Sequence, residues 1–128
     1  MKKVFVYGSL LSGLGNHPLL SNSTLLGVTK SPREFAMLDL GSFPGVVLDE
    51  EGEEMIGEVY EVDDTTMNRL DRLEGYNSNK PEMGLYSKKE IDTEFGKAFI
   101  YIYNNHYGRG DKVINGDWRT HYSKKFNR

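Results

Sequence analysis

The sequence contains no cysteine, which excludes disulfides, thiolate nucleophiles and cysteine metal sites. A chain without disulfides does not depend on an oxidising compartment, so we expect a cytoplasmic protein. No apolar run is long enough to span a membrane, and we expect no membrane partner. The net charge is −3 and no basic stretch is present, so we expect no nucleic-acid partner either.

Familiar ligand motifs are missing as well. No Gly-Lys-Ser/Thr follows the glycines near the N-terminus, and 13–15 (Gly-Leu-Gly) lacks the third glycine of a dinucleotide fingerprint. Ser12 does not sit in a Gly-x-Ser-x-Gly elbow. His17, His106 and His121 do not have the spacing of metal ligands. We therefore expect no metal and no cofactor.

The composition is that of an ordinary soluble protein, with 38% hydrophobic and 27% charged residues, and the length fits one domain over 1–128. Runs of β-branched and aromatic residues predict short strands, and helical patterns predict two short helices. The predicted strands are 3–7, 25–29, 35–40, 46–48, 55–62, 85–92 and 97–103, and the predicted helices are 16–20 and 63 or 64 to about 73. This order predicts an α+β fold: a mixed, mostly antiparallel β-barrel-like sheet, closed or half-closed, with short flanking helices.

Several local features of this pattern are less regular. Gly57 is a candidate bulge inside its strand. The segment 43–45 (Phe-Pro-Gly) favours a turn, although it could instead form the wall of a pocket. From residue 104 onward the sequence has little periodicity, and only Trp118 is a candidate core anchor.

Glu74 is a candidate general acid and base. It lies in the last turn of the predicted helix, next to Gly75, where its charge opposes the helix dipole at a cost of roughly 0.3–1 kcal/mol. Asp71 adds like-charge repulsion from nearly the same face. Both effects, and any burial, would raise the pKa of Glu74 toward the range that proton transfer near neutral pH requires. The alternative is a solvated surface glutamate.

The loop that follows the first strand is a candidate anion site. Gly8 allows the backbone to approach a ligand closely, and successive N–H groups in such a turn can point at one anion. Ser9 adds a hydroxyl donor. The alternative is a plain strand-to-helix connection. Tyr86 opens a strand soon after Glu74 and is a candidate pocket donor or an ordinary sheet tyrosine, whereas Tyr101 and Tyr103 favour sheet-face positions.

Taken in order, these motifs resemble those of the γ-glutamylcyclotransferase-like family, most closely its γ-glutamylamine cyclotransferase branch. The resemblance covers about residues 3–118. The motifs that carry it are Tyr7-Gly8-Ser9-Leu10, Gly15-Asn16-His17, Phe43-Pro44-Gly45, Gly57-Glu58-Val59-Tyr60, Leu70-Asp71-x-Leu73-Glu74-Gly75, Gly84-x-Tyr86 and Gly116-Asp117-Trp118.

The resemblance implies a cyclotransferase, of transferase/lyase type, that releases 5-oxoproline and a free amine or amino acid from a small γ-glutamyl substrate. It implies that the loop Tyr7-Gly8-Ser9-Leu10 binds the substrate α-carboxylate, that Glu74 carries the proton and that Tyr86 lines the pocket. No cofactor is needed, and we expect a monomer or a weak homodimer. Lys88 stands where the family usually has arginine, so a pairing there would be looser, and the segment 77–84 is longer than in many relatives.

Two other functions remain open from the sequence. One is a non-catalytic protein that binds a small acidic metabolite on the same fold, with Glu74 only accepting hydrogen bonds. The other is an interaction module that uses the acidic segment 49–54. The sequence leaves the leaving group of a γ-glutamyl substrate open: a free amino acid, a peptide, an isopeptide lysine and a polyamine all suit the same chemistry.

Overall fold

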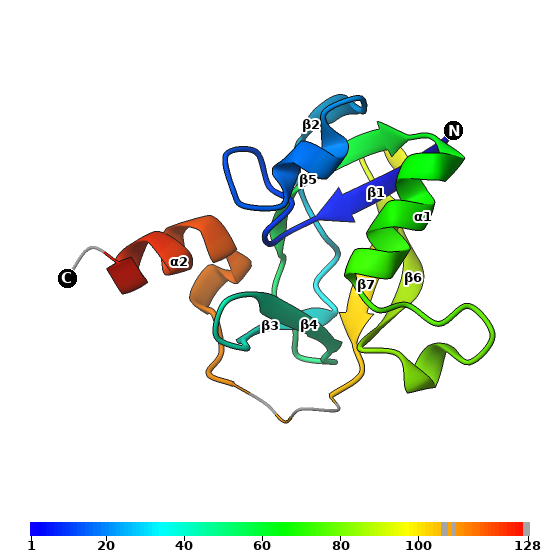
Figure 1. The fold of residues 1–128 in the computed structure, drawn as a ribbon. Coiled ribbons are helices and arrows are strands. Elements are labelled where there is room, and N and C mark those ends of the chain that lie inside the picture. The colour runs from blue at the N-terminus through cyan, green and yellow to red at the C-terminus, as the bar shows by residue number, and fades with distance from the viewer. Residues whose placement is uncertain (106–107, 109, 127–128) are drawn as a thin grey trace.

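The computed structural model describes residues 1–105, 108 and 110–126. A five-stranded mixed sheet in the order β2-β5-β1-β7-β6 carries the fold, and β3 pairs with β4 in a second, two-stranded sheet (Figure 1). The central strand β1 runs antiparallel to β5 and parallel to β7. The strands are β1 (Lys2–Val6), β2 (Thr24–Lys30), β3 (Phe35–Asp39), β4 (Pro44–Leu48), β5 (Ile56–Val62), β6 (Tyr86–Thr93) and β7 (Gly96–Tyr103).

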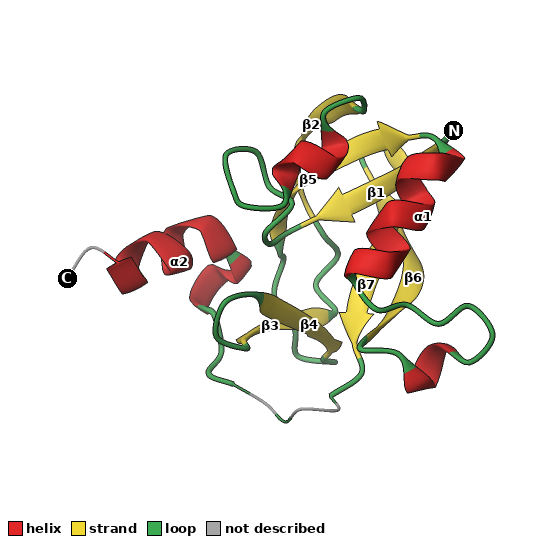
Figure 2. Cartoon of the chain, in the orientation of Figure 1, coloured by secondary structure: helices red, strands yellow, loops and turns green. Residues whose placement is uncertain are grey.

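The helices are short; in Figure 2, α1 lies beside β1 and β7, whereas α2 lies away from the five-stranded sheet. They are α1 (Asp64–Leu73), α2 (Trp118–Phe126) and the 3-10 helices η1 (His17–Leu20), η2 (Pro81–Met83) and η3 (Ile114–Gly116). Asp63 caps α1, because its carboxylate accepts a hydrogen bond from the N–H of Thr66 at 2.7 Å. Gly75 ends α1 with a φ of +64°, a left-handed conformation that favours glycine. No helix of the described residues is both long and apolar enough to cross a membrane.

The core lies on both faces of β1 because its side chains alternate. Val4 packs with Leu70 of α1 on one face, whereas Phe5 packs with Val46 of β4 on the other. Trp118, at the start of α2, is buried in the second cluster at 1% exposure. The predicted α+β fold with a mixed, mostly antiparallel sheet and short flanking helices is therefore confirmed.

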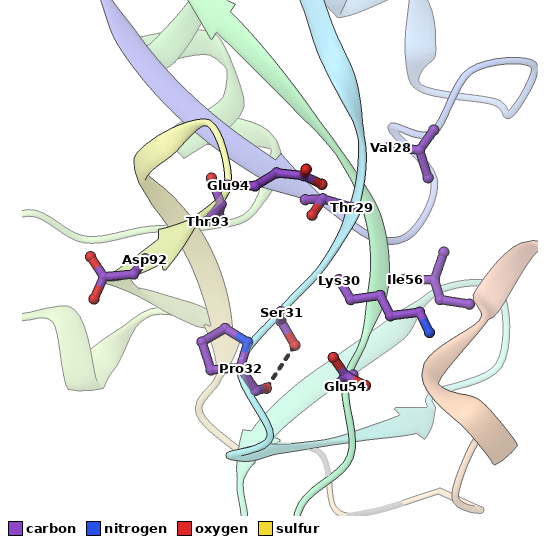
Figure 3. Close-up of a pocket in the computed structure, with 10 residues that line it drawn as sticks. All are labelled: Val28, Thr29, Lys30, Ser31, Pro32, Glu54, Ile56, Asp92, Thr93 and Glu94. Carbon is purple, nitrogen blue, oxygen red and sulfur yellow. Dashed lines mark hydrogen bonds between the residues drawn. The ribbon is translucent and has the colours of Figure 1, made fainter.

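The sheet is not closed into a complete barrel. Within the described residues β2 and β6 are its two edges and do not pair. Gly27 of β2 packs against the ring of Phe95, in the turn between β6 and β7, so the edges come near each other. An open hollow of about 800 Å³ is lined by residues such as Lys30 of β2 and Ile56 of β5 on one side and Glu94 of the β6–β7 turn on the other (Figure 3).

Some local predictions were wrong. Pro44 and Gly45 belong to β4 rather than to a turn. The irregular register lies in β2, between Leu25 and Gly27, and not at Gly57.

The segment after residue 104 contains a helix that its periodicity did not indicate. Polar and apolar residues are mixed around α2, so no apolar stripe marks it in the sequence. It is held by Trp118 in the core and by Asp39, whose carboxylate lies 2.8 Å from Nε2 of His121 and 2.9 Å from Nζ of Lys125. Tertiary contacts of this kind override a weak local pattern.

Candidate active site

A small cavity lies at the end of β1, where the chain leaves the sheet and turns toward η1. Its volume is about 30 Å³, the room that one water molecule occupies. The structure therefore brings the predicted loop and the predicted carboxylate, which are far apart in the sequence, to one place. The lining residues are Phe5, Val6, Tyr7, Gly8, Ser9, Leu10, Pro44, Glu74 and Tyr101.

The loop over this cavity leaves several backbone donors free. Its fold is set by hydrogen bonds from the N–H of Leu11 to the carbonyl of Gly8 and from the N–H of Asn16 to the carbonyl of Ser9, both at 2.9 Å. In the described part of the chain, the N–H groups of Gly8, Ser9 and Leu10 donate to no protein acceptor. The Ser9 hydroxyl accepts a hydrogen bond from Nδ2 of Asn16 at 2.8 Å and keeps its own hydrogen for a ligand. Such a cluster of donors suits a carboxylate.

Gly8 is required by the close approach of two chain segments at this site. A Cβ atom on residue 8 would lie 2.7 Å from Cγ and 2.8 Å from Cδ of Pro44. Glycine therefore lets the loop pack directly on the start of β4. This contact makes Pro44 a wall of the cavity, the alternative to a turn that the sequence left open for 43–45.

Glu74 follows α1 as its C-cap residue, with its backbone N–H bonded to the carbonyl of Leu70 at 3.0 Å. The residue is half-buried, and its side chain makes no hydrogen bond to any described residue. Burial raises the pKa of its carboxyl group from 4.5 to about 7. A carboxyl group that titrates near neutral pH can both accept and donate a proton.

Burial, and not the neighbouring charge, is the cause of that shift. The sequence indicated repulsion from Asp71, but the Asp71 carboxylate is engaged elsewhere. It accepts a hydrogen bond from the hydroxyl of Tyr101 at 2.7 Å and lies 3.1 Å from Nζ of Lys88. Lys88 also lies 4.6 Å from the ring centroid of Tyr76. Lys88 therefore neutralises Asp71.

Two tyrosine hydroxyls support the walls of the cavity. The hydroxyl of Tyr7 donates to the carbonyl of Tyr101 at 2.8 Å, and the hydroxyl of Tyr86 donates to the carbonyl of Pro44 at 2.6 Å. Burial and the charge of Glu74 raise the pKa of Tyr86, so it stays protonated. Tyr86 is therefore adjacent to the site, but its hydrogen is already used by the backbone of β4.

Tyr101 is a lining residue that sequence reasoning missed, because the alternation in its strand favoured a plain sheet-face position. The sequence does not show which face of the sheet α1 covers. Phe99 lies beside Val4 in the parallel register of β7 and β1, and Tyr101 follows it at the next position on the same face. Once α1 packs on that face, Tyr101 lies beneath the helix end that carries Glu74.

The histidines have structural partners where they are described. Nδ1 of His17 lies 3.0 Å from the carbonyl of Leu10 and so helps to hold the loop. His121 contacts Asp39, as noted above. His106 lies outside the described residues. Among the residues that the structure describes, no three acidic, histidine or cysteine side chains group as metal ligands would.

Comparison with known proteins gives the family. The model of the family described as gamma-glutamyl cyclotransferase, AIG2-like, matches residues 4–120. The chain belongs to this family. A relative from Vibrio cholerae, whose name assigns it provisionally to the gamma-glutamylcyclotransferases, is 41% identical over 116 residues, which are 90% of this chain and 93% of that protein.

Two further comparisons bear on activity and on fold. The gamma-L-glutamyl-butirosin B gamma-glutamyl cyclotransferase of Niallia circulans is 34% identical over 109 residues, 81% of this chain and 68% of that protein. The crystal structure of an uncharacterized protein from Pyrococcus horikoshii superposes with a TM-score of 0.80 at 24% identity, covering 100% of this chain and 98% of that one. The names of the relatives support gamma-glutamylcyclotransferase activity in general, and the solved structure supports the fold.

Proposed function

We propose that this protein is a γ-glutamyl cyclotransferase that converts a γ-glutamyl-amine or γ-glutamyl-amino acid into 5-oxoproline and the free amine, with Glu74 as general acid and base. The observation that carries the proposal is the position of Glu74. Its unpartnered carboxyl group, with a pKa raised to about 7, shares one cavity with a loop of free N–H donors.

The loop would bind the α-carboxylate of the substrate. The N–H groups of Gly8, Ser9 and Leu10 are available as donors, and the hydroxyl hydrogen of Ser9 adds another. A γ-glutamyl group is far larger than a cavity of about 30 Å³, so the residues that line the cavity have to rearrange when substrate binds. Holding one end of the substrate by its carboxylate places its α-amine and γ-carbonyl in the cavity beside Glu74.

The reaction is an internal acyl transfer. The Glu74 carboxylate takes a proton from the α-ammonium group of the substrate, and the freed amine attacks the γ-carbonyl carbon. A five-membered ring closes as the new C–N bond forms. Glu74 delivers its proton to the nitrogen of the leaving group, and the original C–N bond breaks. The ring nitrogen still carries two hydrogens at this stage, so Glu74 takes the second proton from it and passes it to the released amine. The products are 5-oxoproline and an amine, Glu74 returns to its charged form, and water is neither added nor lost.

The effects invoked are large enough for catalysis. Proton transfer by a positioned side chain contributes about 10²–10⁴-fold in rate. Holding amine and carbonyl in a near-attack geometry contributes several kcal/mol more. The name of the Niallia circulans relative, a cyclotransferase for a γ-glutamyl group on butirosin B, supports the same reaction class. Among the leaving groups that the sequence leaves open, we propose the γ-glutamyl-amine class as the first to test, because the sequence motifs resemble that branch most closely.

The test is release of 5-oxoproline by the purified protein from γ-glutamyl-ε-lysine, γ-glutamylalanine and glutathione, with Glu74→Gln as matched variant. Glutamine keeps the size of the side chain but cannot carry the proton. Release by the natural protein and loss in the variant, with the γ-glutamyl-ε-lysine reaction the fastest, is the expected result. Best activity on γ-glutamylalanine or glutathione would move the assignment of the leaving group to amino acids or peptides.

Lack of release from every substrate by the folded natural protein would contradict the proposal. Binding of 5-oxoproline or glutamate without turnover would then favour a ligand-binding protein on the same fold. Calorimetric titration with 5-oxoproline or glutamate measures this binding directly.

A further inference from the structure

A second glutamate, Glu58, is buried behind the same loop. It lies in β5, and its side chain is 7% exposed. The antiparallel register of β1 and β5 places Glu58 beside Val6, the last residue of β1. The chain leaves the sheet at this point and forms the loop over the cavity. Glu58 does not line the cavity, so any effect on the reaction must pass through the loop.

Glu58 binds one residue of the loop with both of its carboxylate oxygens. Oε1 accepts the backbone N–H of Ser12 at 2.8 Å, and Oε2 accepts the hydroxyl of the same serine at 3.0 Å. The hydroxyl of Tyr60 donates to Oε1 at 3.0 Å. Ser12 is only two residues beyond Leu10, so its attachment to β5 limits where the N–H groups of Gly8 to Leu10 can point.

Arg119 of α2 completes this attachment from the other side. Its Nη2 donates to the carbonyl of Ser12 at 2.8 Å and lies 3.3 Å from Oε2 of Glu58. The helix that carries it is fixed, because the adjacent Trp118 is buried at 1% exposure and Asp39 contacts two side chains further along α2. A loop near the N-terminus is therefore held by a helix close to the other end of the chain.

We propose that Glu58 and Arg119 are positioning residues for the substrate-binding loop: together they hold Ser12 so that the N–H groups of Gly8 to Leu10 face the cavity. Burying a charged carboxylate is costly unless every oxygen is satisfied, and here both oxygens have partners, all but one of which belong to the loop or to α2. The proposal rests on the proposed function of that loop.

The test compares two arginine variants. Arg119→Ala removes the contact from α2, whereas Arg33→Ala removes an exposed pair of the same 3.3 Å length, between Arg33 and Glu54, whose residues do not line the cavity. With the best γ-glutamyl substrate, we expect Arg119→Ala to raise KM about tenfold and to change kcat less than threefold, since one charge-assisted hydrogen bond is worth about that factor. Arg33→Ala should leave both constants unchanged.

Two further measurements separate positioning from a general loss of structure. Arg119→Lys restores one positive donor and should recover part of the rise in KM. Amide hydrogen exchange of Ser12 should accelerate about tenfold in Arg119→Ala, while the amides of β5 keep their protection. The exchange is measured without substrate. It therefore tests the role of Arg119 even if the natural protein shows no turnover. Absence of turnover would contradict the proposed function but not the contact between Arg119 and the loop.

Glu58→Gln extends the test to the buried carboxylate. The amide oxygen can still accept from Ser12, but the amide nitrogen now faces Nη2 of Arg119, donor against donor. We expect KM to rise at least as much as in Arg119→Ala. Kinetic constants and Ser12 exchange in Arg119→Ala that match those of Arg33→Ala would overturn the proposal. So would a fall in kcat at constant KM, because it would place Arg119 in the chemical step.

Discussion

Two glutamates lie on either side of the loop that follows β1, and their surroundings are opposite. Glu58 is almost fully buried and accepts hydrogen bonds on both carboxylate oxygens from three side chains and one backbone N–H. Glu74 faces the cavity and, among the described residues, has no hydrogen-bond partner for its side chain. The Glu58 carboxylate is therefore held by hydrogen bonds, whereas the Glu74 carboxylate has none to the described residues.

This difference indicates how one fold uses the same residue type for two purposes. Hydrogen bonds to a carboxylate fix the positions of its donors, so a partnered glutamate is suited to hold other groups in place. Withdrawal from water without donors favours the neutral form, which is why the pKa of Glu74 rises to about 7. The loop between the two residues connects them, because Glu58 binds its Ser12 while its Gly8 to Leu10 segment faces Glu74.

The largest expected effect is the loss of turnover in Glu74→Gln. Glu74 is the proposed proton carrier and, among the described residues, the one carboxyl group that lines the cavity, so we expect kcat to fall by about 10²–10⁴-fold. Glu58→Gln, the matched variant, should lower kcat far less, since Glu58 acts through the loop. Initial rates of 5-oxoproline release at saturating substrate measure both. A fall in kcat of similar size for the two variants would contradict the assignment of proton transfer to Glu74 and of a positioning role to Glu58.

The next effect is on stability and depends on pH. The pKa of Glu74 is about 7 in the fold against 4.5 when exposed, so the folded protein binds the proton more tightly. The associated stability is fully present below pH 4.5 and is lost as the pH rises through 7, a change of roughly 3 kcal/mol. Glu74→Gln cannot ionise. At pH 8 its free energy of unfolding should therefore exceed that of the natural protein by up to about 3 kcal/mol.

Urea denaturation of both proteins at pH 5 and pH 8 measures this difference, and other titrating groups cancel in the comparison. The excess stability of the variant should shrink as the pH falls to 5. If the two proteins differed in free energy of unfolding by the same amount at both pH values, burial would not raise the pKa of Glu74.

A smaller change of opposite sign is expected for Glu58→Gln at pH 8. The substitution leaves Arg119 and the hydroxyl of Ser12 without their charged acceptor, so the free energy of unfolding should fall by about 2 kcal/mol. Glu54→Gln is the matched control, because the pair of Glu54 with Arg33 is exposed and contributes less than about 1 kcal/mol. Equal urea midpoints for the two variants would mean that the contacts of Glu58 add nothing to stability.

Much of the fold could be predicted from local patterns. The strands, the Asp63 cap and the Gly75 stop of α1 follow from alternation, capping and left-handed glycine. The resemblance of ordered motifs to a family also predicted that the loop from Tyr7 and the distant Glu74 belong to one site. Capping and turn residues act on their neighbours in the chain, and the order of the motifs can be read along it. A single sequence is therefore enough to predict these features.

What could not be predicted depends on contacts between distant segments. The helix α2 has no apolar stripe and is held by Trp118 and by Asp39, which lies 82 residues before His121. Glu58 stands in an alternating strand like any outward-facing residue, and only the folded chain brings Ser12 and Arg119 to it. The role of Tyr101 required knowledge of which sheet face α1 covers.

The smallest expected effect concerns the cause of the raised pKa of Glu74. The sequence indicated repulsion from Asp71, whereas in the structure Lys88 neutralises Asp71 and burial alone accounts for the shift. When Asp71→Asn is combined with Lys88→Gln, so that both charges of the pair are removed, the acid limb of kcat/KM against pH should therefore stay within about 0.3 of a pH unit of its position near 7. Asp64→Asn, an exposed acid at the other end of α1, is the control. A limb that moves toward pH 6 in the double variant but not in Asp64→Asn would restore like-charge repulsion as a cause, because removing a nearby negative charge lowers the pKa of a carboxyl group.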